Sequence, residues 1–430
     1  MTILKDVLKN QVYPAMGCTE PVSVALCAAH AAKTLGEPVT EAVFILDSGT
    51  YKNGMGVNVP NTGGEKGNLI AGAMGLLIAN PAQAMEILKK VTPKLLDRAR
   101  DIVKTGRVKV SVEPLAKTIH IEARVAGRKN QAVCIISDSH TEVSFLSKNG
   151  RVLKELKKNS VVKNTAWREK LAELSIAEMI CAAEAADRAD IDFIKEGVVM
   201  NLAAAKCGRK LKKVGFYMSE LVRRGYLHDD VFSSTKMLTA YASDARMEGL
   251  PITVMASGES GNQGIVAILA PYNFGKTLKV TPDRIYRSIA LSHLLNSFVK
   301  TYTGGLAPIC GCSIAAGVGA TAAMVYQLKG DDVDAVSLAI NNLISDLGGM
   351  LCDGAKSGCA LKIVSSVDSS IRSAYMGIHH YGITEVEGFV GRTAEDTIRN
   401  LARISRVGME HVDPTIVDIM LKKQDCRMAA

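Results

Sequence analysis

The chain has 430 residues, of which 47% are hydrophobic and 22% are charged, so it can bury a large core and is long enough for two domains. Its net charge of +9 comes from scattered Lys and Arg residues, apart from one dense patch at 206–213. No aromatic ladder or zinc-finger spacing accompanies this patch, so we interpret it as a solvated surface and expect no nucleic-acid partner.

Neither end of the chain nor its interior predicts export or a membrane. The N-terminal segment carries charge from Lys5 onward and has no apolar core with a cleavage site, so we expect a cytoplasmic protein. The stretch 306–328 is almost uncharged, but its many Gly and Ala residues favour a buried helix over a membrane span. Ten cysteines in such a chain favour thiols, metal ligands or catalysis over a disulfide framework.

The first 35 residues are predicted to be helical, with a break at 12–14. The second helix opens at Thr19-Glu-Pro21, which places Cys18 directly before a helix N-terminus. Exposed amides and the positive end of the helix dipole favour a thiolate at such a position, so we expect the pKa of Cys18 to be lowered toward neutrality.

Short apolar or alternating segments then predict an α+β domain. A glycine-bearing turn region is expected at 47–56, and a polar turn carrying His140 is expected at 137–141. The short connections favour antiparallel pairing of the strands. The predicted strands are 42–46, 107–112, 119–125 and 132–136, and the predicted helices are about 67–79 and 82–91.

Strand signals fade after a polar stretch at 154–168, which is the predicted linker. We therefore expect an α+β domain at 1–165, carrying the segment around Cys18, and a mainly α-helical domain at 166–430. The predicted helices of the second domain are 175–188, 190–205, 216–225, 231–247, 282–300, 313–328, 331–348, 366–376 and 393–406.

Four cysteines in the second domain form the strongest local signal. Cys310 and Cys312 begin a predicted helix, while Cys352 and Cys359 lie on a glycine-rich loop. Soft thiolates at such positions suit zinc or an iron–sulfur cluster, and the lack of a C-x-x-C knuckle argues against a zinc ribbon. The alternative is that these are small buried residues of a helical core.

A second group of residues suits a carboxylate. The segment 257–264 contains Ser260 and exposes successive amides, to which Asn262 and Gln263 add directional donors. Arg246 can clamp a substrate carboxylate with two parallel hydrogen bonds, and a surface ion pair with Asp244 is the alternative. His140 is compatible with a structural role or with substrate binding, and Lys52 with a solvated loop position or with substrate binding.

Five separated segments, in order between about residues 10 and 420, resemble the L-cysteine desulfidase family. The second domain of that family is similar to the iron–sulfur L-serine dehydratase α chain. The matching segments are Gly17-Cys-Thr-Glu-Pro21, Lys52-Asn-Gly-Met-Gly-Val57, Ser243-Asp-Ala-Arg-Met247, Ser260-Gly-Asn-Gln-Gly264 and Gly349-Met-Leu-Cys-Asp-Gly-Ala355 with Cys359.

The resemblance implies an α+β domain followed by a serine-dehydratase-alpha-like helical domain, and a [4Fe-4S] cluster held by three cysteines. By position the ligands are Cys312, Cys352 and Cys359, with Cys310 as the alternative to Cys312, and Cys18 maps to the catalytic acid–base group. We expect substrate binding by Arg246, Ser260, Asn262, Gln263, Lys52, Asn53 and His140.

The implied activity is a lyase reaction, the pyridoxal-phosphate-independent β-elimination of L-cysteine to pyruvate, ammonia and hydrogen sulfide. A small amino acid is the expected partner, with no membrane involvement, and the sequence is compatible with a homo-oligomer. The alternatives are a dehydratase of L-serine or a related hydroxy-amino acid, and a non-catalytic thiol- or metal-binding regulator.

Overall fold

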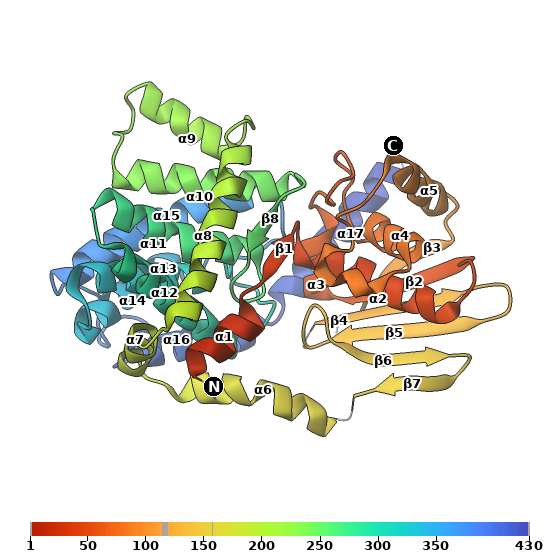
Figure 1. Cartoon of the computed structure of the whole chain (residues 1–430), viewed down its shortest axis with the longest axis horizontal. Coiled ribbons are helices and arrows are strands. Elements are labelled where there is room, and N and C mark those ends of the chain that lie inside the picture. Colours follow the sequence, from red (N-terminus) through yellow and green to blue (C-terminus); the bar gives the residue numbers. More distant parts are fainter. Residues whose placement is uncertain (1, 114–118, 157, 429–430) are drawn as a thin grey trace.

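The computed structural model describes residues 2–113, 119–156 and 158–428, and it has a mixed α/β fold with two lobes (Figure 1). One lobe contains a six-stranded sheet, and the other is built almost entirely of helices. The first part of the chain forms α1 (Ile3–Gln11), β1 (Pro14–Met16), α2 (Thr19–Leu35), β2 (Glu41–Asp47), α3 (Ser48–Met55), α4 (Asn68–Ile78), η1 (Pro81–Glu86), α5 (Pro93–Lys104), β3 (Val108–Glu113), β4 (His120–Ala126), β5 (Gln131–Ser137), β6 (Val143–Lys148) and β7 (Arg151–Glu155).

The second part of the chain contributes the remaining helices and one short strand. These are α6 (Lys158–Glu173), α7 (Ile176–Glu184), α8 (Arg188–Gly208), α9 (Val214–Arg223), α10 (Val231–Met247), β8 (Thr253–Met255), α11 (Gly261–Thr277), α12 (Pro282–Thr303), α13 (Ala315–Lys329), α14 (Val333–Leu347), α15 (Cys359–Ile378), α16 (Ala394–Arg403), η2 (Ile404–Gly408) and α17 (Val412–Met428).

The sheet has the strand order β3-β2-β4-β5-β6-β7, and α2 packs on it through buried small side chains. The four predicted strands are present, but the expectation of antiparallel pairing throughout is wrong for β2 and β3, which run parallel. Along the chain, α3 to α5 come between these two strands. This long crossover allows parallel pairing and places β3 at the edge of the sheet beside β2.

The expected turn region at 47–56 is the helix α3. The Asp47 side chain caps it by accepting a hydrogen bond from the backbone N–H of Thr50 at 2.9 Å. Its glycines serve close packing, because a Cβ at Gly54 would lie 1.7 Å from the Asn68 side chain. The predicted linker is also structured, with β7 and α6 covering most of it, while residue 157 lies outside the described residues.

The helix α13 is the centre of the helical lobe. Residues 315–327 are all buried, and α11, α12, α14 and α15 pack around them. A helix that is buried on every side carries no charged face, which accounts for the uncharged stretch at 306–328. No helix within the described ranges is long and apolar enough to cross a membrane.

Both ends of the chain reach the lobe that the opposite half builds (Figure 1). The helix α1 packs against α12, α6 and α7, and its Leu4, Val7 and Leu8 belong to the helical core. At the other end α17 packs on α3, and Val417 joins the core of the sheet lobe. The boundary at residue 165 stays a prediction, and the pairing of β1 with β8 brings the start of α2 to the junction of the lobes.

Candidate active site

A cavity of about 80 Å³ at this junction, called the inner cavity, brings together nearly all of the predicted site residues. Its walls come from α2, α3, α10, the loop before α11, α12, the loop before α13 and the loop before α15. Of the predicted residues it is lined by Cys18, Asn53, His140, Arg246, Ser260, Asn262, Gln263, Cys310, Cys312, Cys352 and Cys359.

The four late cysteines reach the inner cavity from three separate segments. Cys310 and Cys312 precede α13, Cys352 lies in the loop after α14, and Cys359 is the first residue of α15. The backbone N–H of Lys356 donates to the Cys359 sulfur at 3.4 Å, and an isolated β-bridge joins the neighbouring residues Ile309 and Leu351. The two loops are therefore held together before any metal binds.

The Cys310 and Cys312 side chains interact with one another. A hydrogen bond from Cys312 is the main reason that the pKa of Cys310 is lowered, to about 6, and Ser313 supports it by donating to the Cys310 sulfur at 3.5 Å. The same contact raises the pKa of Cys312. Both sulfurs line the cavity, so the structure leaves either of them available as the ligand.

Cys18 lies directly before α2, as expected, and is its N-cap residue, but its thiol is not activated in the expected way. Burial raises the pKa of Cys18, and the Glu20 carboxylate, which accepts a hydrogen bond from the Cys18 sulfur at 2.8 Å, raises it further. Arg246 opposes this, but the predicted lowering toward neutrality is wrong. The helix dipole is outweighed because the thiol is only 3% exposed and a carboxylate lies beside it.

Arg246 projects from α10 to the cavity and lies against the backbone of Gly261, where a Cβ would be 2.3 Å from its Nε atom. The predicted alternative was an ion pair with Asp244, but Asp244 instead accepts a hydrogen bond from the backbone N–H of Gly215 at 2.8 Å. The Arg246 Nε and the Gln263 Oε1 atoms are buried without a hydrogen-bond partner in the described part of the chain. Unsatisfied polar atoms on one cavity wall indicate a polar ligand.

Lys52 is the exception among the predicted residues, because it does not line the inner cavity. Its side chain is 1% exposed, and its ammonium group donates to the Cys352 carbonyl at 2.7 Å and to Asp413 of α17 at 2.6 Å. Its neighbour Asn53 does reach the cavity and donates to Glu20 at 2.9 Å. Lys52 therefore ties the Cys352 loop to α3 and α17.

Replacing Lys52 by Met should lower the free energy of unfolding by about 3 kcal/mol, because it leaves Asp413 without its buried partner. Urea unfolding followed by circular dichroism measures this change. Lys422→Met is a matched control, since Lys422 forms an exposed pair with Asp418 on the same helix and such pairs contribute less than about 1 kcal/mol. Equal effects of the two substitutions would contradict the anchoring role of Lys52.

Four ionisable residues that line the inner cavity were missed from the sequence: Glu20, Glu259, Lys300 and Lys362. Glu20 lies in the segment 17–21 and Glu259 lies in the segment 257–264, and the sequence already marks both segments as parts of the site. Lys300 on α12 had no such signal, because nothing local shows that its long side chain turns inward. Burial lowers the pKa of Lys300, and its ammonium group donates to the backbone carbonyl of Gly305.

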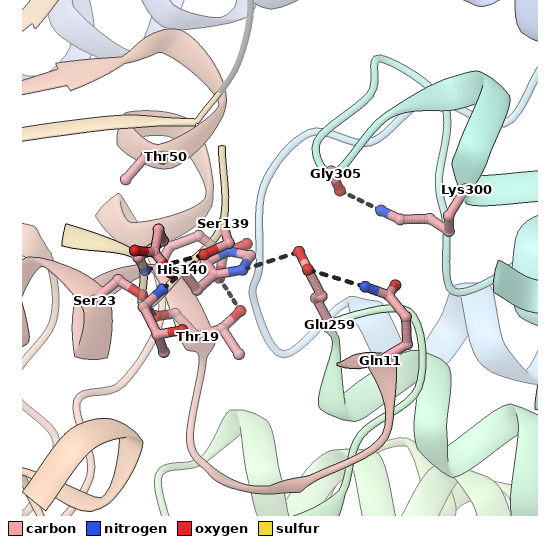
Figure 2. A network of polar contacts seen from close by, with 12 residues as sticks. Gln11, Thr19, Ser23, Thr50, Ser139, His140, Glu259, Lys300 and Gly305 are labelled. Carbon is pink, nitrogen blue, oxygen red and sulfur yellow. Dashed lines mark hydrogen bonds and ion pairs between the residues drawn. The ribbon is translucent and has the colours of Figure 1, made fainter. Parts of the chain in front are cut away.

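A second and larger cavity of about 390 Å³, called the outer cavity, adjoins the first. His140 and Glu259 line both cavities and so form the wall between them. The Nδ1 atom of His140 lies 3.7 Å from Glu259 Oε2, and Gln11 donates to the other carboxylate oxygen at 3.0 Å (Figure 2). The outer cavity is further lined by Lys9, Asn10, Tyr13, Met85, residues 137–139, Thr141, Glu142, Ser144, Leu156, Trp167 and Arg168.

The donor set suits a cluster better than a single ion. Within the described residues, no three His, Cys, Asp or Glu side chains converge tightly enough to hold one metal ion. Thiolates on one zinc ion lie roughly 4 Å apart, since each Zn–S bond is about 2.3 Å. A cluster instead binds each thiolate through a different iron atom, and the soft thiols that line the inner cavity are the type of donor it takes.

Comparison with known proteins identifies the family. The family model described as "Serine dehydratase alpha chain" matches residues 82–418. Proteins named only UPF0597 protein are similar over nearly their whole length, with 58% identity in Elusimicrobium minutum (98% of this chain, 100% of the relative) and 51% in Geobacter sulfurreducens (99% of each). No solved structure matches the chain. The chain belongs to the serine dehydratase alpha chain family.

Proposed function

We propose that this protein is a lyase that removes hydrogen sulfide from L-cysteine by β-elimination, using a [4Fe-4S] cluster and no pyridoxal phosphate. The observation that carries the proposal is the convergence of Cys18, Arg246 and the four late cysteines on one small cavity. Metal-binding thiols, a cationic carboxylate partner and a proton-accepting group are the three parts that such a reaction needs.

Cys352, Cys359 and either Cys310 or Cys312 would hold the cluster. Three protein ligands leave one iron open, and that iron would supply a Lewis acid for the leaving sulfur atom. The chain itself holds the amino acid: the Arg246 guanidinium faces the substrate carboxylate, and Asn262 and Gln263 at the start of α11 add amide donors.

The Cys18–Glu20 pair is suited to accept the α-proton. As this proton moves to the Cys18 sulfur, the thiol proton passes along the existing 2.8 Å hydrogen bond to Glu20. The C–H electron pair then forms the Cα=Cβ bond, the Cβ–S bond breaks, and the sulfur leaves with its electron pair. The resulting aminoacrylate hydrolyses to pyruvate and ammonia.

Anaerobic reconstitution with iron and sulfide, followed by assays with L-cysteine, L-serine and L-threonine, tests the proposal. We expect bound iron and sulfide near four of each per chain, together with pyruvate and sulfide in equal amounts from cysteine. A protein that takes up no cluster and releases no keto acid from any of these amino acids would contradict the proposed function and favour a non-catalytic thiol- or metal-binding regulator.

A dehydratase acting on L-serine is the second candidate, and the description of the matching family favours it. The same cavity chemistry would expel water in place of sulfide. The ratio of kcat/KM for cysteine and serine decides between the two, because it compares how well the site stabilises each transition state.

Arg246→Lys should raise the KM for the amino acid roughly tenfold or more, because a point charge replaces a planar fork with two parallel donors. Steady-state kinetics measure the change, and iron content should be unaffected. Arg223→Lys serves as the control, since Arg223 is an exposed residue of α9 that pairs with Glu220. An unchanged KM in Arg246→Lys would remove Arg246 from the substrate-binding set.

A further inference from the structure

The Cys18 and Glu20 side chains have little direct contact with bulk water. Cys18 and Glu20 are both buried, and Glu20 is already engaged by Cys18, Thr19 and Asn53. Each turnover leaves one proton on this pair, and the pair must lose it before the next turnover. A path from Glu20 to solvent is therefore required if the proposed function holds.

We infer that Glu20, His140 and Glu259 form a relay that carries the α-proton of the substrate from the inner cavity to the outer cavity. The three side chains come from α2, the turn after β5 and the loop before α11. His140 and Glu259 line both cavities, so a proton can pass from one cavity to the other through their side chains. Figure 2 shows these two side chains turned toward each other.

The charges along this path support the inference. Burial alone would lower the pKa of His140, but Glu259 and Glu20 outweigh it and raise that pKa. Burial alone would raise the pKa of Glu259, but His140 and Arg168 lower it. Lys300 is the other charged group that acts on His140, and it weakens protonation there. The two carboxylates therefore favour the transfer of a proton to His140.

The transfer balances without any further reactant. Glu20 releases its proton, through a water in the inner cavity, to His140 Nε2, which has no hydrogen-bond partner among the residues described. His140 gives its Nδ1 proton to Glu259, 3.7 Å away, and Glu259 releases it to water in the outer cavity. A half-turn of the neutral imidazole ring then brings its N–H back toward Glu259, so the relay is reset and one proton has moved outward.

Glu259 is held in a costly conformation that suits this task. Its φ angle is +64°, in the left-handed region that non-glycine residues rarely adopt. Gln11 and Arg168 donate to its Oε1 at 3.0 and 3.2 Å, which leaves Oε2 turned to His140. Local strain that is held by surrounding contacts is typical of functional positions.

The test compares His140→Ala and Glu259→Gln with the wild-type holoenzyme. We expect kcat for the β-elimination to fall at least about tenfold in each variant, with KM and iron content little changed. Millimolar imidazole should restore part of the activity of His140→Ala, because it can enter from the outer cavity. In D2O, unreacted substrate recovered from His140→Ala should carry less α-deuterium than substrate recovered from the wild type.

His120→Ala is the matched control, since His120 pairs with Glu122 at 3.5 Å and lines neither cavity. It should behave as the wild type and show no imidazole rescue. A raised KM with unchanged kcat in both relay variants would overturn the relay and make His140 a substrate-binding residue; wild-type kcat and deuterium exchange would also overturn it. A wild-type enzyme without elimination activity would instead refute the proposed function.

Discussion

Cys352→Ala and Cys359→Ala should each abolish both the brown absorbance of the reconstituted protein and its elimination activity. Each substitution removes one of the two thiols that the stretch from the loop after α14 to the start of α15 places on the cavity wall, and this stretch has no third cysteine to replace it. Substituting a residue that only hydrogen-bonds to a metal ligand already lowers metal affinity roughly 10- to 100-fold. The loss of a direct ligand should therefore lower the affinity more than about a hundredfold. Iron and sulfide counting with visible spectroscopy measures the loss.

Cys181→Ala is the control for this prediction, because Cys181 is an exposed free thiol on α7 outside both cavities. It should retain full iron content. The pair Cys310→Ala and Cys312→Ala then identifies the third ligand, since only one of them should lose the cluster outright. A Cys352→Ala protein with four irons and normal absorbance would end the proposed ligand set.

Cys18→Ala should keep the cluster and lose turnover by roughly 100- to 10,000-fold, the range in which a positioned acid–base group contributes. The substitution removes the sulfur that faces the substrate but leaves the cysteine loops in place. Iron content and kcat, measured on the same reconstituted sample, separate the two effects. Because Cys18 packs near Cys359, unchanged iron content is an essential part of the result.

Cys27→Ala provides the comparison for Cys18, since Cys27 is a buried thiol of the same helix that donates to backbone carbonyls of the sheet. Its loss should affect folding stability and leave kcat unchanged. Glu20→Gln should resemble Cys18→Ala, because an amide cannot take the thiol proton. Full activity in Cys18→Ala would show that another group of the cavity, and not Cys18, accepts the α-proton.

The sequence predicts much of the fold because its local patterns are strong. Alternating apolar residues give β3 to β5, and the helical periods after residue 175 recur as α7 to α10 and α12 to α16, whereas α11 has no predicted counterpart. The failures have physical causes. The glycines of α3 suggest a turn but serve close packing, and β7 is exposed along its whole length, so it has no apolar face to detect.

The candidate site is predictable as a set of residues, but its internal chemistry is not. Motifs at distant positions bring Cys18, Arg246 and Cys352 to attention, and all three line one cavity. The protonation of Cys18 depends on Glu20 and on burial, neither of which a helix N-terminus reveals. The inward turn of Lys300 and the separation of Lys52 from the cavity depend on tertiary packing alone.

The helix α1 packs on the helical lobe and α17 packs on the sheet lobe, so neither half of the chain contains the complete core of its own lobe. A fragment cut near residue 165 would carry α1 with Leu4, Val7 and Leu8 stripped of their neighbours, and the remaining fragment would carry α17 with nothing beneath Val417. During synthesis the core of the sheet lobe is therefore complete only once α17 has been made, and the contact of α17 with α3, which contributes Asn53 to the inner cavity, forms late in folding.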